Sequence, residues 1–181
     1  AVSLDGSVIR KILNPSNSIQ LEPVRAHGAA MEYIPNADPD VQAASVDGDG
    51  RGLWHIPNPS EDLQLRAVRL NAWGIECLKN PSEAVQKAAV QKMGRVIRCI
   101  PNPSTEIQKL AILEEAWAIR FLPNASEELQ ILAVKQKDGS AVKEIKIPSI
   151  AVQMAAVQTD PTALRWLKNP SEEVCLTALR G

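Results

Sequence analysis

The residues of this chain that could carry chemistry are arginine and tryptophan, which recur in register. One column with a step of 22 residues reads Ala29, Arg51, Trp73, Arg95 and Trp117. Because a protein core does not tolerate unpaired arginine, this alternation predicts a face that is exposed or lines a groove. Tryptophan and arginine are the residue types most enriched in binding hot spots, so the column favours recognition of a partner.

Neighbouring columns extend this candidate surface and leave three interpretations open. The face could bind a partner protein, or it could be a solvated face on which arginine stems cover tryptophan rings. It could also bind nucleic acid, with arginine at the phosphates and tryptophan stacked on bases. The further candidate residues are Trp54, Arg98, Arg120, Phe121, Arg165 and Trp166.

Catalytic and metal-binding patterns are absent from the sequence. The two histidines, His27 and His55, have no matching set of nucleophile and acid, and there is no phosphate-binding loop. Residues 47–52 are similar to a calcium loop, but Asn58 occupies the twelfth position, where such a loop needs glutamate. We therefore expect an ordinary turn there, and a protein that is no enzyme and uses no metal or cofactor.

The three cysteines are an odd number without metal-ligand spacing. Cys77 and Cys99 are in register one repeat apart, a separation that exceeds the roughly 7 Å limit between disulfide-bonded Cα atoms. We expect reduced thiols, including Cys175, and hence a cytoplasmic location.

Composition narrows the classes further. The net charge is −1, from 20 Lys and Arg against 21 Asp and Glu, so bulk charge excludes a strongly basic polyanion binder. No apolar run is long enough to span a membrane, and the sequence does not begin with a signal-peptide pattern. Aromatic residues make up 3% of the 181 residues, which is low for a single large core.

An internal repeat explains this composition. Asn-Pro-Ser and related triplets recur at a step of 22 residues, with one inserted residue near position 138. Aliphatic columns keep the same register through the whole chain, which predicts one all-α domain over 1–181: an α-solenoid of about eight 22-residue helical hairpins. The units begin at Asn14, Asn36, Asn58, Asn80, Asn102, Asn124, Ile147 and Asn169.

Each unit is predicted to contain two short helices. We expect the asparagine to cap the first helix, the proline to take its first position, and a glutamate such as Glu61 to complete a capping box. The second helix has only about seven or eight residues and could be partly 3₁₀. A shared glycine column fits the left-handed position that ends a helix. Its members are Gly6, Gly28, Gly50, Gly94 and Gly139.

A glutamine column lies next to the buried aliphatic columns. A partly buried amide needs hydrogen-bond partners, so we expect a structural ladder in which these side chains bond to the backbone of inter-repeat loops. Ligand binding by the amides is the alternative. The column comprises Gln20, Gln42, Gln64, Gln86, Gln108, Gln130 and Gln153, and Cys175 interrupts it.

The unit Asn-Pro-Ser-Glu-x-Val-Gln-x-x-Ala-Val resembles short α-hairpin repeats of bacterial and phage proteins over all 181 residues. It is also similar to the leucine-rich variant repeat and, more loosely, to HEAT-type repeats. The resemblance implies an α-solenoid of prokaryotic or viral origin and no catalytic residue. Glutamine stands where the leucine-rich variant family typically has arginine, and the cysteine cluster of that family's iron–sulfur site is absent.

These patterns together predict a non-enzymatic scaffold that binds a partner protein through the Arg/Trp face of its second helices. A nucleic-acid-binding HEAT-like module is one alternative. Because neither end of the repeat array has a polar cap, we also expect a segment of a longer array, or ends covered by a partner or a second copy. End-to-end stacking into a structural assembly is therefore the other alternative, and frayed termini are the plainer explanation.

Overall fold

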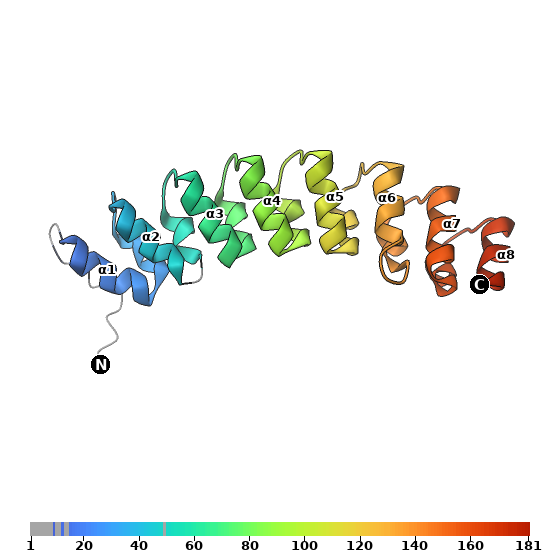
Figure 1. The fold of residues 1–181 in the computed structure, drawn as a ribbon, viewed down its shortest axis with the longest axis horizontal. Coiled ribbons are helices and arrows are strands. Elements are labelled where there is room, and N and C mark those ends of the chain that lie inside the picture. Colours follow the sequence, from blue (N-terminus) through green and yellow to red (C-terminus); the bar gives the residue numbers. More distant parts are fainter. Residues whose placement is uncertain (1–8, 10–11, 13–14, 49) are drawn as a thin grey trace. The chain divides into compact units, whose positions relative to one another are not determined.

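The computed structural model describes residues 9, 12, 15–48 and 50–181. Eight α-helices alternate with seven 3₁₀-helices (labelled η) in this part of the chain, which contains no strand (Figure 1). The all-α prediction is thus confirmed. The chain divides into two compact units, Ala1–Lys92 and Met93–Gly181.

In the first unit, each α-helix packs against the next α-helix, and each 3₁₀-helix against the next 3₁₀-helix. The helices alternate strictly along the chain. They are α1 (Asn17–Ala26), η2 (Gly28–Tyr33), α2 (Pro39–Asp47), η3 (Arg51–His55), α3 (Glu61–Leu70), η4 (Ala72–Cys77) and α4 (Glu83–Lys92).

The second unit repeats this arrangement, with one row of α-helices and one row of 3₁₀-helices in successive contact (Figure 1). Two such rows allow each repeat to bury its apolar side against its neighbours. The helices are η5 (Gly94–Cys99), α5 (Thr105–Glu114), η6 (Ala116–Phe121), α6 (Glu127–Val134), η7 (Ser140–Glu144), α7 (Ile150–Thr159), η8 (Pro161–Trp166) and α8 (Glu172–Arg180).

The core lies between the two rows and is aliphatic. In α5, Ile107, Ala111 and Ile112 are at most 2% exposed, and Ile119 of η6 packs into the same core at 3%. Burying an isoleucine side chain stabilises a fold by about 1.5–3 kcal/mol, so each repeat contributes through a few such residues. Small alanines in the same register let neighbouring helices approach closely, which is why so few rings are needed.

The predicted N-cap is wrong. In six repeats the cap is the serine of the triplet, whose hydroxyl oxygen accepts the amide N–H three residues on at 3.3–3.4 Å. Asn36, Asn58 and Asn102 instead have φ of +60°, +54° and +49°. Asparagine adopts this left-handed conformation more readily than most residues. The Asn-Pro pair is therefore a turn that precedes the helix. The capping serines are Ser60, Ser82, Ser104, Ser126, Ser149 and Ser171.

This shift also removes the predicted capping box. With Ser60 as the cap, Glu61 is the first residue of α3 rather than the third, and Leu63 takes the third position. The glutamates still lie in the first turn, where they favour the helix dipole. Two of them also link repeats, because Ser82 Oγ bonds to a carboxylate oxygen of Glu61, and Ser149 Oγ to one of Glu127.

The glycine column is only half explained by left-handed backbone. Gly50 and Gly139 have φ of +77° and +68°, whereas Gly28 and Gly94 do not have positive φ. All four lie against a carbonyl oxygen of the next repeat's α-helix: a Cβ built on Gly94 would be 2.5 Å from the Ala111 oxygen. Close backbone approach is thus what the column shares. Gly6 lies outside the described residues.

Candidate partner-binding surface

All six aromatic residues lie in 3₁₀-helices, which places them as the sequence predicted, on the second helix of their repeats. Among them, Trp117 and Trp166 are half-buried and Trp54 is 47% exposed. They occur in five of the 3₁₀-helices: Tyr33 in η2, Trp54 in η3, Trp73 in η4, Trp117 and Phe121 in η6, and Trp166 in η8.

In the second unit, a cation of one repeat lies over the ring of the next. The guanidinium carbon of Arg95 in η5 is 5.8 Å from the centroid of the Trp117 ring in η6. The Trp117 ring in turn packs against Phe121, with centroids 6.0 Å apart and planes tilted by 59°. Arg120 covers the Phe121 ring at 5.5 Å. Such contacts contribute about 0.5–1 kcal/mol each at exposed sites and hold the rings in place.

Two cations lie close to the Trp166 ring. The Lys143 ammonium of η7 lies 5.9 Å from its ring centroid, and the Arg165 guanidinium carbon of η8 lies 4.3 Å from it. The charged groups of arginine and lysine therefore lie against rings on this face. The rings of Trp117, Phe121 and Trp166 are half-buried, whereas Arg120, Lys143 and Arg165 beside them are exposed.

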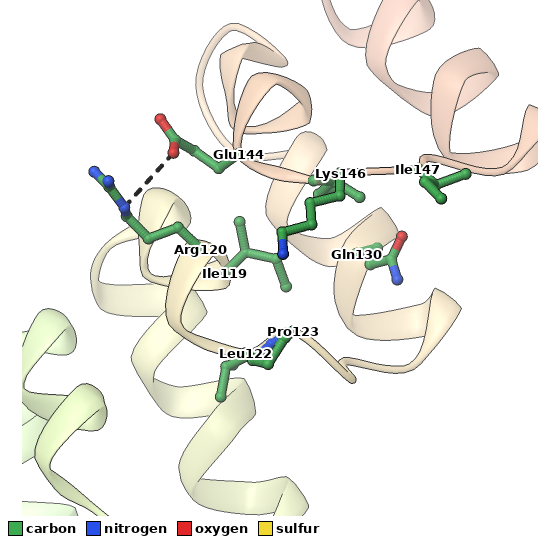
Figure 2. A pocket seen from close by; sticks show the side chains of 9 residues that line it. Ile119, Arg120, Leu122, Pro123, Gln130, Glu144, Lys146 and Ile147 are labelled. Carbon is green, nitrogen blue, oxygen red and sulfur yellow. Dashed lines mark ion pairs between the residues drawn. The ribbon is translucent and has the colours of Figure 1, made fainter.

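A cavity of about 270 Å³ opens beside this surface, between η6, η7 and the loop before α7 (Figure 2). Its lining includes the apolar side chains of Ile119, Leu122 and Ile145, together with Gln130 of α6. At its rim, Nε of Arg120 lies 3.7 Å from a carboxylate oxygen of Glu144, the ion pair drawn in Figure 2. Sequence reasoning did not single out Glu144; its signal is that it occupies the column that elsewhere holds Phe121 and Trp166.

A second cavity, of about 430 Å³, shares Arg120 and Glu144 with the first and has Trp117, Glu115 and Lys143 in its lining. One carboxylate oxygen of Glu115 and Nε of Arg95 are shielded from solvent without a hydrogen-bond partner in the described part of the protein. The cavity mixes acids and bases, and its lining also includes Ser140 and Asp138, which are hydrogen-bonded to each other.

The candidate residues of the first unit are more dispersed. Arg51 is exposed, Trp54 projects from η3, and Trp73 is half-buried. The backbone N–H of Trp73 donates to the side-chain oxygen of Asn71 at 3.2 Å. This hydrogen bond caps η4 and fixes where that helix begins. Arg98 of the second unit is exposed on η5, beside half-buried Arg95.

The side chains of the glutamine column bond to loops, and one of them, Gln130, also lines the smaller cavity (Figure 2). Each side-chain amide nitrogen donates to the backbone carbonyl oxygen five residues earlier, in the loop that leads into its own α-helix, at 2.7–3.0 Å. Each bond thus joins a loop to the fourth residue of the helix that follows it. Six of the seven acceptor carbonyls lie in loops that connect the 3₁₀-helix of the preceding repeat to the α-helix of the glutamine.

The cysteines form no disulfide among the described residues. The Cys77 thiol donates to the carbonyl oxygen of Gly74 at 3.0 Å, and burial is the main cause that raises its pKa above the usual value. No group of three or more His, Cys, Asp or Glu side chains suited to a metal ion occurs among the described residues. Asp49 of the calcium-like turn lies outside them, and Asp47 is paired with Arg66.

Two aspartate side chains accept hydrogen bonds from backbone N–H groups in turns. The Asp138 carboxylate accepts the N–H of Ser140 at 3.1 Å, and hydrogen bonds from Ser140 lower the pKa of Asp138. Asp160 accepts the N–H of Thr162 in the same way at 2.8 Å. Asp160 caps η8, whereas Asp138 lies in the turn that precedes η7, so both hydrogen bonds hold the backbone at the start of a 3₁₀-helix.

In the part of the chain that the structure describes, no helix has both the length and the apolar character needed to cross a membrane. Comparisons with protein-family models, with curated proteins and with solved structures gave no match. Function must therefore be argued from the surface itself.

Proposed function

We propose that this protein is a non-enzymatic α-solenoid scaffold that binds a partner protein through the Arg/Trp face of its 3₁₀-helices. The observation that carries the proposal is the arrangement of Arg95, Trp117, Phe121 and Arg120 in the second unit, where rings and cations lie in mutual contact. The same proposal relates the repeats to short α-hairpin repeats of bacterial and phage proteins and expects a cytoplasmic protein without cofactor.

The contacts within this face favour binding to a macromolecule. Half-buried rings held by neighbouring cations lose little freedom when a partner covers them, and this lowers the entropic penalty of association. Arginine adds planar donors that match carboxylates and backbone carbonyls. In the larger of the adjoining cavities, hydrogen bonds from Ser140 lower the pKa of the Asp138 carboxyl, which makes that carboxylate a weaker base.

Two observations support rival functions. Bases and rings gathered on the 3₁₀-helices of the second unit would also suit a single-stranded nucleic acid. In α8, Leu176 is 42% and Leu179 80% exposed, so a second copy could pack there in an end-to-end assembly. Light scattering at increasing protein concentration tests the assembly, which predicts dimers or filaments that Leu176→Ser and Leu179→Ser abolish.

The partner-binding proposal is tested by affinity capture from the source cell, with wild type compared against the Trp73→Ala/Trp117→Ala double variant. A captured protein is then purified and titrated calorimetrically with the wild type and with each single variant. Loss of a buried hot-spot tryptophan typically weakens binding by tenfold or more.

Ile150→Ala is the matched control, because Ile150 is 58% exposed and lies at the start of α7, in the other row of helices. Trp117→Phe keeps an aromatic ring and is the variant to use if Trp117→Ala fails to fold. Circular dichroism shows whether each variant is folded. Equal affinities of the wild type and both tryptophan variants for the purified partner would exclude this face as the binding surface.

A further inference from the structure

The second unit is electrically divided between its two rows of helices. Its 3₁₀-helices η5–η8 carry five bases and one acid, Glu144, whereas its α-helices α5–α8 carry six acids and two bases. In the described part of the first unit, η2–η4 carry one base and two acids, so these three helices form no basic row. The near-zero charge of the whole chain therefore hides a basic face that belongs to the second unit.

Four of these bases form a regular column. Arg98, Arg120, Lys143 and Arg165 take the same place in successive 3₁₀-helices, and all four are exposed. Because η5, η6, η7 and η8 pack each against the next, and packed helices lie about 8–10 Å apart, the cations repeat at about that step.

This step selects the conformation of a bound acidic chain. A polyproline II helix has three residues per turn and rises about 3.1 Å per residue, so its same-side groups recur about every 9 Å. Same-face groups of a β-strand recur about every 7 Å, and would drift out of step with the column after one or two repeats. An extended peptide with a carboxylate at every third residue therefore matches the column.

The rings beside the column suit the remaining residues of such a peptide. Trp117 and Phe121 lie next to Arg120, and Trp166 lies next to Lys143 and Arg165. Proline-rich segments dock on aromatic surfaces in a preformed polyproline II conformation. The ion pair of Arg120 with Glu144 uses Nε of Arg120, and arginine has further N–H donors for a carboxylate.

We propose that the 3₁₀-helix face of the second unit binds an extended, proline-rich acidic peptide that carries a carboxylate at every third residue. This inference rests on the proposed function and defines the chemical class of its partner. Regularly spaced carboxylates meet Arg98, Arg120, Lys143 and Arg165, while prolines pack against the rings of Trp117, Phe121 and Trp166.

The test uses the full chain and a fluorescein-labelled peptide of four Asp-Pro-Pro triplets, followed by fluorescence anisotropy at low salt. A second peptide has the same composition but places its four aspartates at alternate positions. We expect the triplet peptide to bind at least about fivefold more tightly, because only its carboxylates keep step with the column. Equal binding of the two peptides, or no binding of either, overturns the inference.

Charge variants locate the site. Surface ion pairs contribute about 0.2–1 kcal/mol each, so Arg120→Gln and Arg165→Gln should each weaken triplet binding by up to about fivefold. Lys109→Gln and Arg180→Gln remove exposed cations from α5 and α8 of the same unit and should leave binding unchanged. Equal effects of both pairs would overturn the site, since attraction would then depend on net charge alone.

A twelve-residue oligothymidylate serves as the third probe. Binding of this probe more tightly than the triplet peptide, with loss in Arg120→Gln, would assign the face to nucleic acid and overturn the inference. A partner captured through Trp117 that binds normally while the triplet peptide does not would leave the proposed function standing and refute only the peptide class.

Discussion

The side-chain amide nitrogen of Gln108 donates a hydrogen bond of 2.9 Å to the carbonyl oxygen of Pro103. The bond connects the second turn of α5 to the loop that leads into it. The same contact recurs in seven repeats, so it is part of the repeat's construction rather than a feature of one loop.

Replacing Gln108 by leucine should lower the free energy of unfolding by about 1–2 kcal/mol. The substitution removes one net hydrogen bond and leaves the half-buried Pro103 carbonyl without that donor. Urea unfolding followed by circular dichroism measures the change. Gln158→Leu is the control, because Gln158 lies exposed on α7, and it should change stability by less than about 0.5 kcal/mol. Equal decreases in the free energy of unfolding of the two variants would show that the Gln108–Pro103 hydrogen bond does not stabilise the protein.

The position of the helix cap gives a second prediction. Ser60→Ala removes the hydroxyl that accepts the Leu63 N–H and should destabilise the protein by about 1 kcal/mol. Asn58→Gly should be nearly neutral, because glycine adopts the φ of +54° found at Asn58 without strain. Asn58→Ala should destabilise the protein by about 1–2 kcal/mol, because in the left-handed conformation the alanine Cβ crowds the following carbonyl oxygen. Thermal or urea unfolding distinguishes these outcomes, and an unchanged Ser60→Ala protein would contradict the serine cap.

Close approach at Gly94 gives the third prediction. A Cβ at Gly94 would lie 2.5 Å from the Ala111 carbonyl oxygen, so Gly94→Val must push η5 away from α5. We expect a loss of about 1–3 kcal/mol, as for other overpacked sites. Gly48→Ala is the matched control, since a Cβ there meets nothing within 4 Å, and its φ of −73° suits alanine. A loss in Gly48→Ala as large as in Gly94→Val would show that the effect is not steric.

The thiol of Cys77 gives the fourth prediction. Burial raises the pKa of Cys77, so at pH 8 a smaller fraction of this thiol is thiolate than in the unfolded chain. Because the thiolate is the nucleophile, alkylation by iodoacetamide should be slower in the native protein and should accelerate only at higher pH. Peptide mass spectrometry after timed labelling gives the rate at each pH, with the urea-unfolded chain as control. A native pH midpoint at or below that of the unfolded chain would contradict the prediction.

Sequence and structure agree on the core and on the placement of the rings, but not on the residue that caps the helix. The aliphatic columns located core residues such as Ile107 and Ile119, and the aromatic columns located the rings on the second helices, because both follow from helical period and repeat register. The identity of the capping residue did not follow in this way. Asn58 and Ser60 are both good cap residues by type, and only the backbone conformation at Asn58 decides between them.

The candidate surface divides in the same manner. The alternation of Arg95 and Trp117 in the sequence indicated a face outside the core, and both residues are half-buried at its edge. Their cation–ring contact and the covering of Trp166 by Lys143 depend on how one repeat is set against the next. The position of one repeat relative to the next cannot be read from a column of residue types in the sequence.

The sequence by itself determined the repeat, the all-helical class and the residues that share a face. It did so because apolar residues recur at the same positions of every 22-residue unit. Only the tertiary structure decided where helices begin, why Gly94 must be small, and that Arg120 pairs with Glu144. Those features arise from backbone torsions and from contacts between neighbouring repeats, and both depend on distances in space rather than on positions along the chain.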